Sequence, residues 1–200
     1  MNKIGRITLA GVLLVMFSLE VNAQEERKQP RFSHKGFKFL AGLGALELPS
    51  GDEFDEGQAA QLSLGYGFSN HSTLWLTLKG AELPSKTNSQ FDTNFNAVEL
   101  SYQYKFMPQS RLQPYGKIGI GAYELDATKI DVARRGGGIN VALGADFFLS
   151  RHFGIGVEAF FKDIEYTRLV QGRAGGEIER DITPSLNRDS RGLMLTLTIQ

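Results

Sequence analysis

Seven charged residues stand at alternate positions within otherwise apolar segments of the chain. They are Lys79, Glu99, Lys105, Lys117, Asp146, Glu158 and Lys162. If these segments are strands, the charges share one face with glycines and serines, and the opposite face is apolar. Basic and acidic groups enclosed in a narrow interior should pair, because an unpaired buried charge costs several kcal/mol. We therefore predict a network of interior ion pairs and no wide aqueous channel.

Catalytic and metal-binding patterns are weak by comparison. The segment Ser69-Asn70-His71-Ser72 combines a nucleophile with a base, but no acidic partner is placed beside it, so a turn is the better interpretation. His34 falls in a polar N-terminal stretch, and His71 and His152 fall in short turn-like connections. A histidine in a turn is usually only solvated. We expect no catalytic residue, no metal site and no cofactor.

Charged connections offer candidate contact surfaces. Each is also consistent with an ordinary solvated loop. A basic, glycine-rich segment at 134–138 could touch lipopolysaccharide phosphates through Arg134 and Arg135. An acidic segment could bridge cations through Asp52, Glu53, Asp55 and Glu56. The segment 164–191 is the best candidate for contact with a partner. It contains Arg168, Arg173, Arg180, Arg188 and Arg191 among Glu177, Glu179, Asp181 and Asp189.

The elements that must position these residues alternate with period two, which indicates strands. We predict eight strands, at about 36–48, 58–68, 72–81, 95–106, 114–125, 137–149, 153–163 and 192–200. Short turns at 69–71, 107–113 and 150–152 alternate with long polar connections at 49–57, 82–94, 126–136 and 164–191. That order is typical of an outer-membrane barrel with short periplasmic turns and longer outer loops.

Composition narrows the class of protein further. The chain has 22 basic and 22 acidic residues, which argues against a nucleic-acid-binding face, and it has no cysteine for disulfides or thiolate metal sites. Residues 1–23 have the basic start, apolar run and small-residue site of a cleaved signal peptide. A retained membrane anchor is the alternative. Residues 24–34 are polar and are predicted to form a flexible periplasmic leader.

Each predicted strand is long enough to cross a bilayer at a tilt near 45°. Only a closed barrel then satisfies every backbone amide in hydrocarbon. Aromatic residues gather beside the short turns, where a membrane-interface girdle belongs. They are Tyr66, Phe68, Tyr102, Tyr104, Phe106, Phe147 and Phe153. A soluble barrel or sandwich with its faces reversed is the alternative, but it would gain little from glycines on the polar face.

Two segments carry a resemblance to a known family, LQPYGKIGIGAY at 112–123 and NVALGADFFLSRHFGIGVEAFF at 140–161. The chain resembles the small outer-membrane β-barrel proteins of the OmpA and OmpX type, of Gram-negative bacteria, over residues 35–200. The resemblance implies an all-β, eight-stranded, antiparallel up-and-down transmembrane barrel. It also implies contact with outer-membrane lipid, lipopolysaccharide and the barrel insertion machinery. Such proteins usually end in an aromatic residue, whereas this chain ends Thr198-Ile199-Gln200.

These observations favour a monomeric, non-enzymatic outer-membrane protein with a structural or surface-interaction role. A surface partner would bind through the segment 164–191, and no nucleic-acid partner is expected. Two alternatives stay open: a narrow porin-like channel, and a lipid-modifying enzyme that uses Ser69 and His71.

Overall fold

The computed structural model describes residues 32–48, 56–86, 92–172 and 178–200. Several predictions fall outside the described residues: the signal peptide at 1–23, the leader at 24–31, and the charged residues Asp52, Glu53, Asp55, Arg173 and Glu177. Among the described residues, no helix has the length and apolarity needed to cross a bilayer.

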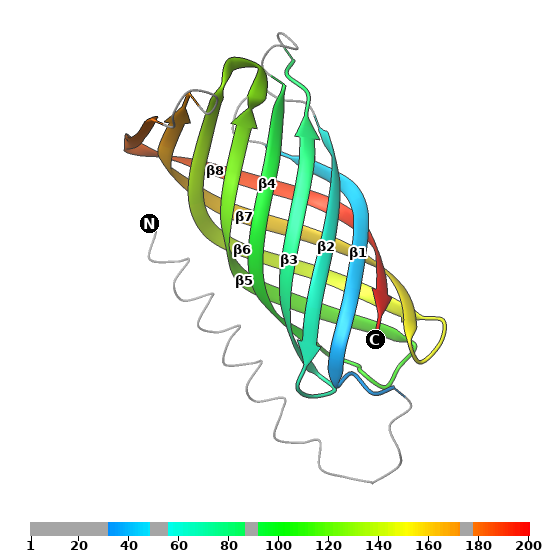
Figure 1. Ribbon diagram of the computed structural model, residues 1–200. Helices are drawn as coiled ribbons and strands as arrows, with labels where there is room; N and C mark the ends of the chain where they lie inside the picture. Colours follow the sequence, from blue (N-terminus) through cyan, green and yellow to red (C-terminus); the bar gives the residue numbers. More distant parts are fainter. Residues whose placement is uncertain (1–31, 49–55, 87–91, 173–177) are drawn as a thin grey trace, which may run out of the picture. The chain divides into compact units, whose positions relative to one another are not determined.

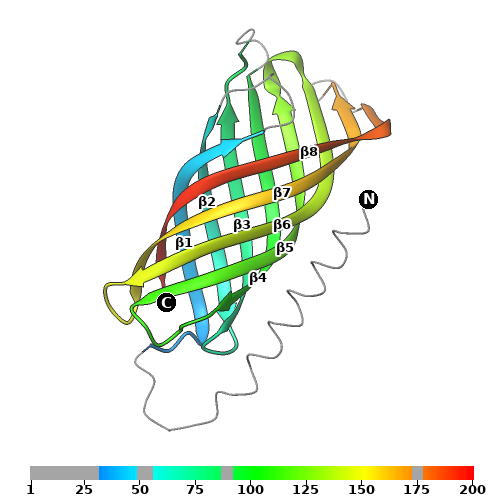
Figure 2. The same cartoon turned by 180° about the vertical axis from the view of Figure 1, so that it is seen from behind.

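Eight antiparallel strands close into a barrel, as the sequence predicts (Figures 1 and 2). Each strand pairs with its neighbours in the chain, and β1 pairs with β8 to complete the ring. The strands are β1 (Gly36–Glu47), β2 (Gly57–Gly67), β3 (Ser72–Leu83), β4 (Thr93–Lys105), β5 (Leu112–Ala127), β6 (Val132–Phe148), β7 (Phe153–Gln171) and β8 (Ile178–Ile199). A short 3-10 turn, η2 (Thr128–Ile130), joins β5 to β6.

Over the part of each strand nearer the short turns, the apolar face points out of the barrel. In β2, the side chains of Leu62 and Leu64 are 53% and 54% exposed, while Gln61 and Ser63 between them are buried. So continuous a belt of exposed leucine, isoleucine, valine and phenylalanine would be unfavourable in water. The belt therefore needs hydrocarbon around it, and the soluble alternative with reversed faces is wrong.

Aromatic side chains ring the end of the barrel that carries the short turns. Phe37, Tyr66, Phe68, Tyr102, Phe106, Phe147 and Phe153 are all exposed there. Tyr104, which we expected among them, is only 5% exposed, because its ring packs between those of His71 and Phe106 at 5.3 and 5.6 Å. The first strand begins and the last strand ends at this edge, so this edge is assigned to the periplasmic side.

The two last long connections are largely strand, which corrects the prediction. The expected loop at 126–136 shrinks to η2 and its flanking residues, and most of the expected loop at 164–191 extends β7 and β8 into a ribbon. The alternating apolar positions change face after Phe161, from outward to inward at Ile164 and Tyr166, so one continuous period-two pattern did not reveal the extension. Cross-strand partners support it instead, because Arg168 stands opposite Asp181. The part of β8 that precedes Arg191 does not pair with β1.

The half of the interior nearest the outer loops is apolar, a feature that the sequence analysis missed. Leu46, Leu83, Phe95, Leu125 and Ile164 are almost completely buried there and pack as one cluster with Tyr123 and Tyr166. Their outward neighbours on the strands are polar, for example Glu47, Glu82 and Asn96. The two faces therefore exchange character where the barrel leaves the membrane, as in a soluble sheet.

Candidate functional site: the interior of the barrel

All seven predicted interior charges lie on the inner wall. Lys105 Nζ contacts Asp146 Oδ2 at 2.8 Å, Lys117 pairs with Glu158, and Lys162 pairs with Glu99. Each pair joins strands that are not neighbours: β4 to β6, β5 to β7, and β7 to β4. The six side chains are at most 7% exposed. The ion pairs therefore cross the lumen and tie its walls together.

Lys79 differs from the other three predicted lysines. Its Nζ lies 3.7 Å from the centroid of the Phe160 ring, and no carboxylate of the described residues is within ion-pair distance. The ring faces the ammonium group as a cation–π partner. Lys38, which was not predicted as a site residue, joins this group of interior lysines and donates to Thr73 Oγ1 at 3.0 Å. The signal for Lys38 was present, because period two places it on the same face as Gly42 and Gly44.

Large aromatic side chains fill the space between the ion pairs. Trp75 is 1% exposed and donates from Nε1 to Gln103 Oε1 at 2.7 Å. Tyr115 is also 1% exposed and donates to Glu158 Oε2 at 3.0 Å. Inner-face glycines make room for both rings: a Cβ on Gly65 would lie 2.6 Å from Trp75, and one on Gly144 would lie 2.5 Å from Tyr115. These two glycines of the polar face thus allow the large rings to pack against the inner wall.

The periplasmic mouth is closed by the residues just before β1. Phe32 is 4% exposed and His34 is fully buried, and both rings pack against Phe148, at 5.6 and 5.4 Å between centroids. Phe32 exchanges backbone hydrogen bonds with the Gln109 side chain at 3.1 and 3.3 Å. The sequence predicts a flexible leader over 24–34, and at its end the rings of Phe32 and His34 pack into the mouth.

His34 is fixed by three separate parts of the periplasmic edge. Its backbone N–H donates to Asn70 Oδ1, and its ring nitrogens lie 2.7 Å from Gln200 Oε1 and 2.9 Å from the Pro108 carbonyl. These acceptors favour the charged ring, but burial and the ammonium groups of Lys105 and Lys38 outweigh them and lower the pKa of His34 from 6.5 to about 4. The ring is therefore neutral at neutral pH and donates to one of the two oxygens.

The Ser69 and His71 side chains serve the turn between β2 and β3. Ser69 Oγ accepts from the backbone N–H groups of His71 and Ser72, at 3.2 and 3.0 Å. The Nδ1 atom of His71 contacts the Lys105 carbonyl at 2.8 Å. His152 makes the equivalent contact to the Gln200 carbonyl at 2.9 Å. In the described part of the chain, no cluster of histidine and carboxylate groups has metal-binding geometry.

The candidate contact residues of the outer connections lie mostly on strands. Arg135 is in β6, where its Nε donates to Glu124 Oε2 at 2.6 Å on the outer wall. Arg191 is in β8 and donates to Glu47 Oε2 at 2.9 Å. On the ribbon, Arg168 pairs with Glu179 at 3.2 Å. The Arg135–Glu124 and Arg191–Glu47 pairs mark the level at which the apolar belt ends, and the Arg168–Glu179 pair lies beyond that level.

An apolar outer belt, an aromatic edge and a filled ionic interior together define a small outer-membrane β-barrel. Residues 10–179 match the outer membrane protein beta-barrel domain, and the chain belongs to that family. It is a protein of the bacterial outer membrane.

Solved structures agree with this fold. The Neisserial surface protein NspA is 15% identical, with a TM-score of 0.57, over 82% of this chain and 97% of that one. The outer membrane protein OprG from Pseudomonas aeruginosa is 16% identical, with a TM-score of 0.57, over 84% of this chain and 97% of that one. At such identities the likeness concerns the fold alone. No curated protein matches the chain.

Proposed function

We propose that the protein is a closed, non-enzymatic barrel whose role is structural or lies in surface contacts made by its outer ends. The observation that carries this proposal is the filling of the lumen along its length. Phe32 and His34 fill the periplasmic mouth, ion pairs and aromatic rings fill the middle, and an apolar cluster fills the outer half. A continuous water path would have to break several of these contacts at once.

The contacts of Ser69 and His71, the pair that the sequence offers for catalysis, support a non-enzymatic role. Ser69 Oγ and His71 Nδ1 each contact backbone atoms of the turn and its neighbour. A serine nucleophile needs its hydroxyl directed at a basic ring nitrogen and a third group to orient that ring. If purified protein deacylated or transferred acyl chains of lipopolysaccharide, and Ser69→Ala stopped this, the proposal would fail.

The ribbon formed by β7 and β8 is the best-placed surface for contact with a partner. Its strands pair as far as Gln171 and Ile178, well outside Arg191, the first residue of β8 that pairs with β1 (Figure 1). Its exposed side chains carry charges of both signs, including Arg168, Arg180 and Asp181, while Val170 is buried and Ile182 packs against the apolar interior cluster. A partner bound here would contact the ribbon outside the bilayer.

Conductance in planar bilayers tests the closed lumen. We expect wild-type protein, refolded and shown to be inserted by its heat-modifiable gel mobility, to give no steady current steps above the lipid background. Inserted protein that produces steady single-channel steps would support the channel alternative and overturn the proposal. A larger porin inserted into the same bilayers serves as the positive control.

A further inference from the structure

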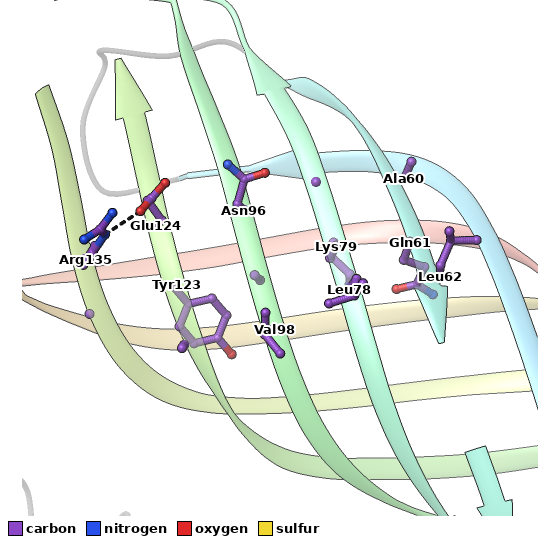
Figure 3. A pocket seen from close by; sticks show the side chains of 14 residues that line it. Ala60, Gln61, Leu62, Leu78, Lys79, Asn96, Val98, Tyr123, Glu124 and Arg135 are labelled. Carbon is purple, nitrogen blue, oxygen red and sulfur yellow. Dashed lines mark hydrogen bonds and ion pairs between the residues drawn. The ribbon is translucent and has the colours of Figure 1, made fainter. Parts of the chain in front are cut away.

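The outer wall of the barrel is hollowed over β2 to β6, toward the outer loops. The hollow measures about 620 Å³, and none of its lining residues comes from β1, β7 or β8 (Figure 3). The exposed side chains of its lining, such as Leu62, Leu78 and Val98, point away from the barrel axis. The residues between them, such as Gln61 and Lys79, are buried with their side chains inside. The hollow therefore opens toward the membrane and not into the lumen.

Two rows of residues, running across the strands, build the hollow. The lower row places Leu62, Leu78, Val98 and Ala122 side by side in register. The upper row, nearer the loops, places Ala60, Gly80, Asn96, Glu124 and Arg135 side by side. The lower row is apolar, whereas three positions of the upper row are polar. The boundary between hydrocarbon and headgroups on the outer side of the membrane thus falls across the hollow.

Small residues make the wall recede at this boundary. Ala60, Gly80 and Ala122 carry at most one methyl group each, and a Cβ on Gly80 would meet nothing closer than 3.8 Å. On β7 and β8 the same membrane-facing wall carries Phe161 and Leu193, which are 43% and 57% exposed. The wall thus recedes over β2 to β6, whereas large exposed side chains cover it at these positions of β7 and β8.

The polar rim of the hollow offers hydrogen-bonding groups of every kind. Arg135 Nε donates to Glu124 Oε2 at 2.6 Å, and the Arg135 and Glu124 side chains remain 39% and 25% exposed. Asn96, which is also exposed, adds an amide that both donates and accepts. In Figure 3 these three side chains follow one edge of the hollow, above Leu78 and Val98. A guanidinium suits phosphate, while carboxylate and amide groups suit sugar hydroxyls.

We propose that this hollow binds lipopolysaccharide of the outer leaflet. Its acyl chains would lie side by side over Leu62, Leu78 and Val98, and its phosphorylated sugars would meet Asn96, Glu124 and Arg135. Five neighbouring strands, each about 4.8 Å from the next, give a width that accommodates several chains at once. The level of the hollow, the breadth of its apolar floor and the mixed polarity of its rim together favour this lipid over a two-chain phospholipid.

The test compares two alanines of the membrane-facing wall. Ala122→Leu fills the hollow, while Ala159→Leu adds the same volume on β7, outside it. Each purified protein is titrated in detergent with deep-rough lipopolysaccharide and, separately, with phosphatidylglycerol, and bound lipid is counted by native mass spectrometry. We expect wild type and Ala159→Leu to retain lipopolysaccharide alike, and Ala122→Leu to bind it about tenfold more weakly. Arg135→Gln, which leaves the barrel interior unchanged, should also weaken it.

Three outcomes would overturn the proposal. All four proteins could retain lipopolysaccharide equally. Wild type could retain phosphatidylglycerol as tightly as lipopolysaccharide, which would indicate an ordinary annulus. Wild type could also be a dimer that Ala122→Leu converts to a monomer, with lipopolysaccharide retention unchanged, which would assign the hollow to a second copy of the chain. Heat-modifiable mobility shows that each variant is folded, and Arg135→Gln provides the test if Ala122→Leu does not fold.

Discussion

Single side chains show why the interior charges could be predicted and their partners could not. Period two places Lys105 and Asp146 on the same face as the glycines, and a barrel interior is the only enclosed space that such a face can line. Which lysine meets which carboxylate depends on strand tilt and register, because each pair joins strands that are not neighbours. The cation–π contact between Lys79 and Phe160 depends on the same geometry and has no counterpart in sequence spacing.

Replacing one member of a buried ion pair should lower the free energy of unfolding more than the loss of the interaction alone would. We expect Lys105→Met or Asp146→Leu alone to lower the free energy of unfolding by about 3 kcal/mol, because each leaves an uncompensated buried charge. The double variant should lose clearly less than the sum of the two. Urea unfolding in lipid vesicles, followed by the fluorescence of Trp75, the only tryptophan, measures all three.

An exposed pair provides the control for this comparison. Arg191 and Glu47 are 58% and 47% exposed, so Arg191→Ala should leave the free energy of unfolding nearly unchanged. Additive losses at Lys105 and Asp146 would show that the two charges do not depend on each other.

His34 should make the stability of the periplasmic mouth depend on pH. Its pKa is about 4 in the folded barrel and 6.5 when exposed, so between these values the unfolded chain binds more protons. Stability is therefore complete above pH 6.5, falls as the pH drops toward 4, and changes no further below 4 on account of this residue. The whole effect is at most roughly 3 kcal/mol. Wild type and His34→Gln, unfolded in urea at several pH values, should differ in slope within this window; parallel curves would contradict the assignment.

At the scale of strands, the glycines of the two faces have different tasks. Inner-face glycines such as Gly65 lie under large rings, while outer-face glycines such as Gly80 face open space. The sequence shows that glycines alternate with apolar residues, but not which aromatic ring each glycine accommodates. It also stops indicating one continuous strand where the apolar positions change from the outer to the inner face, which is why the extension of β7 and β8 past residue 163 was missed.

A glycine-to-alanine substitution should be destabilising on the inner face and nearly neutral on the outer face. A Cβ on Gly65 would lie 2.6 Å from the Trp75 ring, so Gly65→Ala should lower the free energy of unfolding by about 1 to 3 kcal/mol. Gly80→Ala, on the neighbouring strand but facing outward, should change it by less than about 0.5 kcal/mol. The shift in the heat-modification temperature on gels provides the measurement. Equal shifts for both variants would contradict the packing role of the inner glycine.

The ribbon should be dispensable for the barrel. Tyr166 and Leu186 stand directly opposite each other, so residues 167–185 can be replaced by an Asn-Gly hairpin without disturbing the register below. We expect the shortened protein to insert and to keep its heat-modifiable mobility, since β8 pairs with β1 only from Arg191 onward. Any surface binding that the ribbon provides should disappear. Failure of the shortened chain to fold would show that the ribbon belongs to the barrel itself.

For the whole molecule, the sequence was sufficient for fold class, strand number and sidedness. These follow from backbone pairing in hydrocarbon and from period two, which are properties of all strands together. The packing of Phe32 and His34 into the mouth, the apolar outer half of the lumen and the lipid-facing hollow were not predictable. Each depends on residues from several strands that meet only after the barrel closes.

The central claim is the orientation of the two faces, with apolar side chains toward lipid and ionic and small ones inside. The chain has no cysteine, so single cysteines can be placed along β2 without background and spin-labelled after insertion into vesicles. We predict that labels at Leu62 and Leu64 collide readily with oxygen dissolved in lipid, while a label at Ser63 is shielded from both oxygen and a water-soluble nickel reagent. Shielded labels at Leu62 and Leu64, with a label at Ser63 open to water, would contradict the account.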